Sequence, residues 1–247
     1  MNNHEVNMSV NTLQLREQKF SNTIVSEPLL KRDFLQFSLI NELAIKDDPK
    51  QELMSEAEQQ QSIYELMKSR PEGDLWIFGY GSLVWNPAIR YEERRSARIS
   101  GWHRKFCLSI TALRATARQP GLMLALDKGG RCDGTAYRIS EDNIHQELSL
   151  LWRREMMCSG YIPRWVPITD HNDMPFGWAL AFTIDSEHPK YVGDLVENAI
   201  AQHLSVASGS LGSAADYLFR TFEGLQANGI RDGHLERLTR LVRNLIN

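Results

Sequence analysis

The sequence predicts an α+β domain that has a strand-rich middle and helices toward both ends. Short runs of β-branched and aromatic side chains recur between about residues 75 and 184, whereas apolar residues on either side of this region recur at helical spacing. With 247 residues, 42% of them hydrophobic, the chain can bury a full core. We expect residues 71–247 to form one main domain, preceded by residues 1–70 as an N-terminal tail and helical extension.

The N-terminal part divides into a polar tail and two expected helices. Residues 1–22 are rich in Asn, Ser and Thr and show little periodicity, which is typical of a loosely docked tail. Between residues 28 and 69, apolar residues recur at helical spacing on both sides of a polar interruption at residues 46–51. These helices could cover the main domain or mediate oligomerisation, and we favour the covering role.

A buried strand and a glycine-rich turn open the main domain. Residues 75–78 are aromatic and aliphatic, which predicts a strand that ends at Gly79. Gly79 and Gly81 flank Tyr80, so the backbone can turn sharply and approach a ligand closely. The backbone N–H groups of Gly81, Ser82 and Leu83 could then converge on an anion. An ordinary tight turn between two core segments fits the same pattern.

This turn does not match the glycine signatures of nucleotide-binding proteins or hydrolases. The dinucleotide fingerprint requires a third glycine where Val84 stands and a helix from there, whereas Pro87 opposes helix at Asn86. A phosphate-loop lysine is missing, and the hydrolase elbow requires glycine at the position of Tyr80. Ser82 is therefore a poor candidate for a nucleophile.

The middle of the chain predicts further strands. Before the central helix they are expected at about residues 97–101, 105–111, 122–126 and 135–139, with a polar loop at residues 114–121. Residues 127–131 (DKGGR) predict a hairpin turn between the last two. After the helix, residues 161–168 and 176–184 predict two more strands, and Pro163 and Pro167 place the first of them at an edge or a bulge.

The helix expected after residue 140 places one carboxylate on its apolar face. The apolar residues of this face are Ile144, Leu148, Leu151 and Trp152. Glu155 continues the face near the helix C-terminus, where burial and the helix dipole would both raise its pKa. Glu155 is therefore the best candidate for a general acid/base. The alternatives are a helix end frayed into water or a structural glutamate that pairs with Arg153, Arg154 or Arg164.

Three helices are expected in the C-terminal part. The first covers residues 194–206, and a glycine-rich break follows it at residues 208–212. The second starts at Ser213 or Asp216 and stops near Gly229, and Asp232 caps the last.

Composition and charge favour a small-molecule protein over a nucleic-acid binder. The net charge is −3 and the pI is near 6.2. A local basic cluster comprises Arg90, Arg94, Arg95, Arg98, Arg104 and Lys105, and Glu92 and Glu93 interrupt it. We interpret the cluster as a solvated face or an attractor for small anions.

Cysteine usage and hydropathy predict a soluble cytoplasmic protein without a metal or a cofactor. Cys107, Cys132 and Cys158 are far apart and form no Cys-x-x-Cys pair, and the chain has no His-x-x-x-His pair. A signal peptide is not expected at the N-terminus, and the longest later apolar run, residues 178–184, is too short to span a bilayer.

Several separated motifs, from about residue 71 to the C-terminus, resemble those of the ChaC-type glutathione-specific γ-glutamylcyclotransferases, and most closely their bacterial members. The matching segments are residues 78–87 (FGYGSLVWNP), 101–104 (GWHR), 152–156 (WRREM), 160–161 (GY), 188–191 (HPKY) and 212–218. The chain departs from the family pattern around its second and third cysteines and in residues 1–70, and neither departure touches the assignments below.

The resemblance implies a fold, a reaction and a set of site residues. The implied fold is a small, partly closed mixed β-barrel with helices packed around it. The implied reaction is that of a lyase, which splits glutathione into 5-oxoproline and cysteinylglycine. Glu155 matches the catalytic glutamate of the family. Its γ-glutamyl-binding loop matches residues 79–83, namely Gly79, Tyr80, Gly81, Ser82 and Leu83.

The reaction needs no enzyme nucleophile, because the α-amine of the substrate attacks its own γ-amide carbonyl. Glu155 would take a proton from the amine and return it to the departing nitrogen. The amides of Gly81 to Leu83 would face either the α-carboxylate or the developing oxyanion. Tyr80, Arg114 and Tyr161 are further candidates for polar contacts with the substrate.

Besides RNA or DNA binding through the arginine cluster, which we do not expect, two other functions stay open at this point. The first is a cyclotransferase that acts on other γ-glutamyl amino acids or amines, because ring closure depends only on the γ-glutamyl half. The second is a non-catalytic regulatory module that binds a ligand without turning it over.

Overall fold

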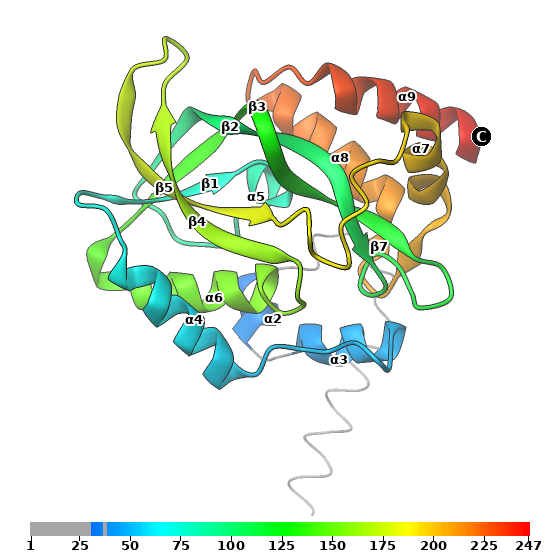
Figure 1. Ribbon diagram of the computed structural model, residues 1–247, viewed down its shortest axis with the longest axis horizontal. Helices are drawn as coiled ribbons and strands as arrows, with labels where there is room; N and C mark the ends of the chain where they lie inside the picture. The colour runs from blue at the N-terminus through cyan, green and yellow to red at the C-terminus, as the bar shows by residue number, and fades with distance from the viewer. Residues whose placement is uncertain (1–30, 37–38) are drawn as a thin grey trace, which may run out of the picture.

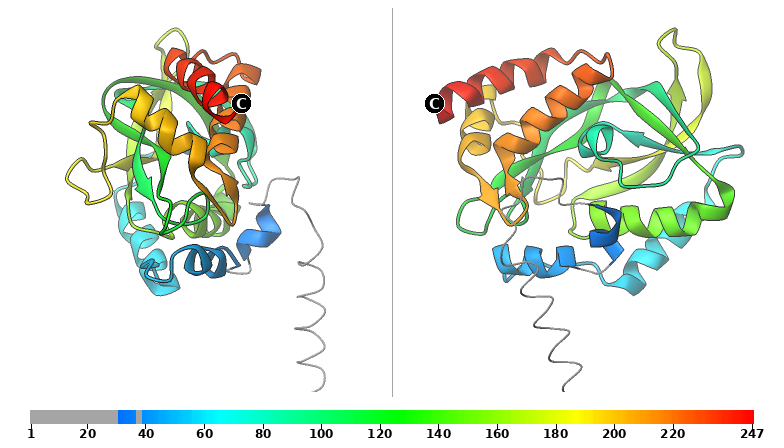
Figure 2. Two further views of the ribbon diagram at one scale, coloured as in Figure 1. Left: turned by 90° about the vertical axis from the view of Figure 1, so that its right-hand side faces the viewer. Right: turned by 180° about the vertical axis from the view of Figure 1, so that it is seen from behind.

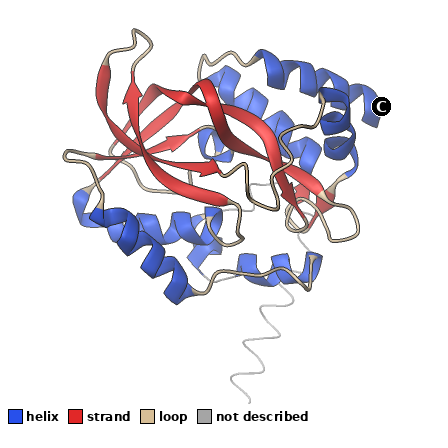
Figure 3. Cartoon of the chain, in the orientation of Figure 1, coloured by secondary structure: helices blue, strands red, loops and turns tan. Residues whose placement is uncertain are grey.

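Five strands form a closed barrel, and helices pack on two sides of it (Figures 1 and 3). The computed structural model of the chain describes residues 31–36 and 39–247. The predicted tail, residues 1–22, lies outside the described residues. The predicted α+β class and the barrel are both confirmed.

The helices and strands carry the labels of Figure 1. In chain order they are α2 (Arg32–Gln36), α3 (Leu39–Asp47), α4 (Glu56–Lys68), β1 (Leu75–Gly79), α5 (Ser82–Trp85), β2 (Glu93–Ile110), β3 (Gly121–Ile139), η1 (Glu141–Asn143), α6 (Ile144–Glu155), β4 (Tyr161–Thr169), β5 (Pro175–Ile184), α7 (Glu197–Val206), β6 (Ser208–Gly209), β7 (Gly212–Ser213), α8 (Ala214–Ala227) and α9 (Gly233–Ile246).

The barrel closes because β1 pairs with a strand on each side. The strand order is β1-β3-β2-β4-β5. β1 runs antiparallel to β3, with Leu75 opposite Ile139, and parallel to β5, with Trp76 opposite Ala179. Parallel pairing to a distant strand requires a long crossover, and the intervening β2, β3, α6 and β4 supply it.

The hairpin predicted at residues 127–131 is wrong. β3 runs without reversal from Gly121 to Ile139 and pairs along its length with β2. β2 is likewise one continuous strand where two were predicted, at residues 97–101 and 105–111. Gly129 and Gly130 adopt positive φ, as does Gly101 on the facing strand, where the pairing register shifts. The glycines therefore form a bulge that bends a long two-stranded ribbon around the barrel.

Both faces of β1 are buried, which explains its uninterrupted apolar sequence. Ile77 belongs to a hydrophobic cluster that contains Leu148 and Trp152 of α6, whereas Phe78 belongs to a second cluster that contains Leu218 of α8. Helices α2, α3, α4 and α6 lie along one side of the barrel, and α7, α8 and α9 lie along the other (Figures 1 and 2). The strand that leads to the glycine turn is thus held from both sides.

The N-terminal helices pack against α6 and the loop after β2. Helices α2 and α3 occupy the range of the first predicted helix, and residues 37–38 between them lie outside the described residues. Ile40 of α3 clusters with Ala112 and Leu150, and Arg32 of α2 forms an ion pair of 2.6 Å with the buried Glu147. The division of the chain at residue 70 stays a prediction.

The C-terminal helices follow the prediction closely. Ser213 caps α8 by accepting from the amide of Asp216, and Asp232 caps α9 by accepting from the amide of Leu235. Helix α7 begins at Glu197, three residues later than expected. Within the described part of the chain, no helix combines the length and apolar character needed to cross a membrane.

Candidate active site

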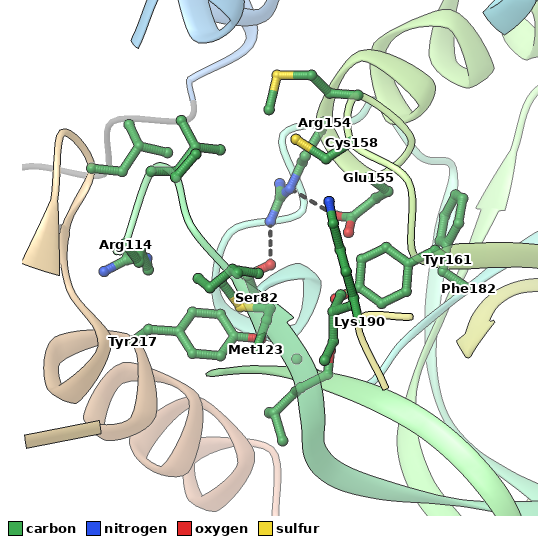
Figure 4. A pocket seen from close by; sticks show the side chains of 18 of the residues that line it. Ser82, Arg114, Met123, Arg154, Glu155, Cys158, Tyr161, Phe182, Lys190 and Tyr217 are labelled. Atoms are coloured by element: carbon green, nitrogen blue, oxygen red, sulfur yellow. Dashed lines mark hydrogen bonds and ion pairs between the residues drawn. The ribbon is translucent and has the colours of Figure 1, made fainter. Parts of the chain in front are cut away.

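An open cleft lies where the glycine turn, the end of β2, the C-terminus of α6 and the start of α8 meet (Figure 4). It contains about 1080 Å³ of empty space, including the part that opens to solvent. The predicted site residues that line it are Tyr80, Gly81, Ser82, Leu83, Arg114, Glu155 and Tyr161. Gly79 lies behind this lining at the end of β1, against Leu83 and Tyr137.

The glycine turn runs directly into a short helix that the sequence analysis did not predict. Helix α5 begins at Ser82, with Gly81 as its N-cap, and ends before Asn86, as Pro87 requires. The amide of Val84 donates to the Gly81 carbonyl at 3.0 Å. The amides of Ser82 and Leu83 lie in the first turn of the helix, where N–H groups have no carbonyl partner within the helix.

Arg104 fixes the orientation of the turn through a hydrogen bond to its backbone. This side chain is 4% exposed, and its Nε donates to the Tyr80 carbonyl at 2.5 Å. Its two terminal nitrogens donate to the Asp133 carbonyl and to Asp232. Because a trans peptide directs its C=O and N–H to opposite sides, the Gly81 amide points away from Arg104. The buried guanidinium therefore sets the peptide plane at the center of the turn.

Gly81 leaves no room for a larger residue. A Cβ at this position would lie 2.7 Å from the hydroxyl oxygen of Tyr217, which projects from α8. Burial raises the pKa of Tyr217 to about 12, so its hydroxyl stays protonated at neutral pH. Tyr217 was not predicted as a site residue, although it lies in one of the matching segments.

Glu155 is the last residue of α6, and its side chain is only 14% exposed. Burial raises the pKa of its carboxyl, and the neighbouring Arg154 guanidinium opposes this effect. Arg154 Nε lies 3.0 Å from Glu155 Oε1, so one of the alternative partners considered above is present. Among the described residues, Oε1 nevertheless has no partner in hydrogen-bonding geometry. Glu155 is thus a buried carboxylate with unused acceptor capacity at a cleft wall.

Arg154 connects this helix end to the glycine turn. Its Nη2 donates to Ser82 Oγ at 2.8 Å (Figure 4), and its Nη1 donates to the Asn86 carbonyl at 2.6 Å. The Ser82 hydroxyl is therefore held by a cation, and no hydrogen bond joins it to a carboxylate or an imidazole of the described residues, which agrees with its being a poor candidate for a nucleophile. Because Arg154 spans the two elements, Glu155 and the turn are kept in fixed relative positions.

The three other predicted polar residues each contact protein groups at the cleft. The hydroxyl of Tyr80 donates to the Phe182 carbonyl at 2.8 Å, and that of Tyr161 donates to the Leu124 carbonyl at 2.6 Å. Burial raises the pKa of both. Arg114 Nη1 donates to the Ser213 carbonyl at 2.9 Å, and its guanidinium lies over the ring of Tyr217.

Lys190 and Cys158 also line the cleft, and the sequence analysis did not identify them as site residues. Lys190 and Arg154 lie in segments 188–191 and 152–156, so the matching motifs were the available signal. Burial raises the pKa of the Cys158 thiol, which disfavours the nucleophilic thiolate. In the described residues, no group of three or more His, Cys, Asp or Glu side chains could hold a metal ion.

A family model and individual relatives of known function indicate the same family for this chain. The model of a family described as "ChaC-like protein" matches residues 75–245. The chain is 44% identical over 195 residues to the glutathione-specific gamma-glutamylcyclotransferase of Escherichia coli (strain K12), covering 78% of this chain and 84% of that protein. It is 33% identical over 186 residues to glutathione-specific gamma-glutamylcyclotransferase 1 of Homo sapiens, covering 72% of this chain and 83% of that protein.

A solved structure shares the fold. It is the crystal structure of a gamma-glutamyl cyclotransferase specific to glutathione from yeast, with a TM-score of 0.63 and 20% sequence identity. The match covers 70% of this chain and 97% of that chain.

Proposed function

The chain belongs to the ChaC-like family, and on that premise we propose that it is a γ-glutamylcyclotransferase that acts on glutathione. The observation that carries the proposal is the juxtaposition of a buried carboxylate, Glu155, and a rigid glycine turn on the walls of one cleft. A base beside a turn whose amides lie at a helix N-terminus suits a reaction in which the substrate supplies its own nucleophile.

The reaction is an intramolecular transfer. The α-amino nitrogen of the γ-glutamyl group attacks the γ-carbonyl carbon, and the new C–N bond closes a five-membered ring. The bond between this carbon and the cysteinyl nitrogen then breaks, which releases 5-oxoproline and cysteinylglycine. Holding the γ-glutamyl chain in a curled conformation can supply effective molarities of roughly 10⁵ to 10⁸ M.

Glu155 is proposed to carry the proton. The α-ammonium group first loses one proton to solvent. As a carboxylate, Glu155 accepts a second proton from the attacking nitrogen, and as a carboxylic acid it returns this proton to the departing cysteinyl nitrogen, which takes up another from solvent after release. Burial supports both steps because it raises the pKa of the carboxyl toward the working pH. Neither step consumes a residue of the enzyme, so Glu155 is regenerated in each turnover.

The turn formed by residues 79–83 is proposed to hold the reacting half of the substrate. The amides of Gly81 to Leu83 would bind the α-carboxylate or the developing oxyanion, and both groups lie within a few bonds of the carbon that reacts. Arg104 and Arg154 support this role because they fix the turn through the Tyr80 carbonyl and the Ser82 hydroxyl. Further polar contacts with the substrate are proposed for three residues of the cleft lining, Tyr80, Arg114 and Tyr161.

We further propose that this protein is cytoplasmic and that its binding partner is a small molecule. The three cysteines are free, as a reducing compartment favours. The predicted basic cluster also fits a small-molecule protein better than a nucleic-acid binder, because Arg98 pairs with Asp133 and Asp173 and Arg104 with Asp232.

The test is product analysis with the purified full chain. Reduced glutathione and γ-glutamyl-alanine are incubated separately with the protein, and 5-oxoproline is measured in each mixture. We expect 5-oxoproline and cysteinylglycine from glutathione and far less product from γ-glutamyl-alanine. Equal rates would indicate a broader cyclotransferase, and ligand binding without 5-oxoproline would indicate a regulatory module.

The pH dependence of turnover should report the titration of Glu155. Because burial raises its pKa, the carboxyl becomes protonated as the pH falls through a value above the usual 4.3 or so, and it can then no longer accept a proton. We expect kcat/KM for glutathione to decline on the acid side with an apparent pKa above this ordinary value. Circular dichroism at each pH controls for unfolding. A rate that stays constant down to about pH 4.3 would contradict the assignment.

A further inference from the structure

Lys190 brings a positive charge into the cleft from the segment after β5. Its side chain is half-buried and lines the cleft beside Tyr161 (Figure 4). The backbone of this segment is fixed, because the Ser109 amide donates to the Lys190 carbonyl at 2.8 Å and the Tyr191 amide donates to the His188 carbonyl at 2.8 Å. The side chain therefore starts from a defined position along the end of β2.

The ammonium group of Lys190 lies near one carboxylate, that of Asp48, whose pKa its charge lowers. Among the residues that the structure describes, no carboxylate forms an ion pair with its Nζ. The other two cations of the cleft are engaged: Arg154 donates to Ser82 and Asn86, and Arg114 donates to Ser213 and lies near Asp216. Without a close ion pair, the partly buried ammonium is compensated only through the more distant Asp48, so Lys190 is suited to an anionic group that arrives with the ligand.

Lys190 lies toward the part of the cleft formed by the N-terminal helices. Ser109, which holds its backbone, is two residues from Thr111, and the Thr111 hydroxyl donates to Asp48 at 2.5 Å just after α3. Gln51 of the same segment also lines the cleft. The glycine turn, in contrast, is joined to α6 by Arg154. The charge of Lys190 acts on Asp48 and Cys158, so the cleft offers a cationic group on the side that these two residues form.

Glutathione carries two carboxylates, and only one of them lies near the reacting carbon. The α-carboxylate shares its carbon with the attacking amine, so it stays at the turn and Glu155. The glycyl carboxylate lies at the far end of two residues, which span at most about 7 Å when extended. A second cationic group at a separate place in the cleft matches this second carboxylate.

We propose that Lys190 binds the glycyl carboxylate of glutathione and makes the enzyme prefer the tripeptide over shorter or uncharged γ-glutamyl compounds. This inference rests on the proposed function, and it adds a specificity-determining residue to it. Lys190 has no role in the proton transfer, so its removal should affect substrates according to their charge at the glycyl end.

The experiment combines a charge change in the protein with one in the substrate. Lys190→Met and Lys190→Arg are compared with wild type on glutathione and on its glycyl monoethyl ester, which lacks the distal charge. Since a charge-assisted hydrogen bond is lost, we expect Lys190→Met to lower kcat/KM for glutathione by about 10- to 100-fold and to change that for the ester by less than about 3-fold. Lys190→Arg should retain most of the preference. Lys128→Met, at an exposed position, is the matched control and should resemble wild type.

The outcomes separate this inference from the proposed function. Absence of 5-oxoproline from glutathione with the wild-type protein would overturn the proposed function and the inference with it. Normal wild-type turnover with equal losses on both substrates for Lys190→Met, or with no loss on glutathione, would overturn the role of Lys190 alone. A loss confined to glutathione, largely restored in Lys190→Arg, is the result expected.

Discussion

Glu155→Gln is expected to reduce 5-oxoproline formation from glutathione by at least about 10² to 10⁴-fold, the range attributed to general acid/base catalysis. The amide of glutamine has nearly the same shape as the carboxyl but cannot accept the proton of the attacking nitrogen. The measurement is the initial rate of 5-oxoproline release at saturating glutathione. Glu223→Gln, at an exposed position on α8, makes the same chemical change away from the cleft and should leave the rate unchanged.

The fold of Glu155→Gln should survive. Burial raises the pKa of Glu155 in the folded protein above its unfolded value, so above the folded pKa the ionised carboxyl lowers the free energy of unfolding. Glutamine removes this penalty, and Arg154 keeps its hydrogen bonds to Ser82 and Asn86. The melting temperature at neutral pH should therefore be at least that of wild type. Wild-type turnover by the folded variant would show that Glu155 is not the proton carrier.

The sequence predicted the elements of this site because local patterns determine them. The spacing of apolar residues in α6 is a local signal, and it placed Glu155 on the inward face at the helix end. The apolar run of β1 likewise located the glycine turn, since a strand buried on both faces shows no alternation. The short helix α5 escaped prediction because four residues are too few to show helical periodicity.

The errors and omissions arise where distant segments decide the structure. Gly129 and Gly130 suit a hairpin turn and a bulge equally well, and only the long pairing of β3 with β2 selects the bulge. In the same way, Arg104 falls in a run of basic residues that suggests an exposed surface. Its burial depends on Tyr80 and Asp232, which are 24 and 128 residues away along the chain. Partners at this distance leave no pattern in a single sequence.

Gly81→Ala is expected to lower kcat for glutathione by about 10²-fold, the loss that a misplacement of about 1 Å can produce in a preorganised site. The new Cβ would lie 2.7 Å from the Tyr217 hydroxyl oxygen, so the turn or α8 must move. Gly233→Ala is the matched control, because its Cβ would meet only the end of Arg237 at 3.7 Å. This control should turn over glutathione at the wild-type rate.

A second substitution tests whether the steric contact is the cause. Tyr217→Phe removes the hydroxyl oxygen, after which the alanine Cβ would be 3.8 Å from Leu124 and 3.9 Å from the ring carbon of residue 217, both ordinary contacts. If the oxygen alone displaces the turn, Gly81→Ala combined with Tyr217→Phe should be at least about tenfold faster than Gly81→Ala, although it carries more changes. Tyr217→Phe alone sets the upper limit for this recovery. A double variant no faster than Gly81→Ala would mean that the glycine is needed for its backbone conformation and not for the space it leaves.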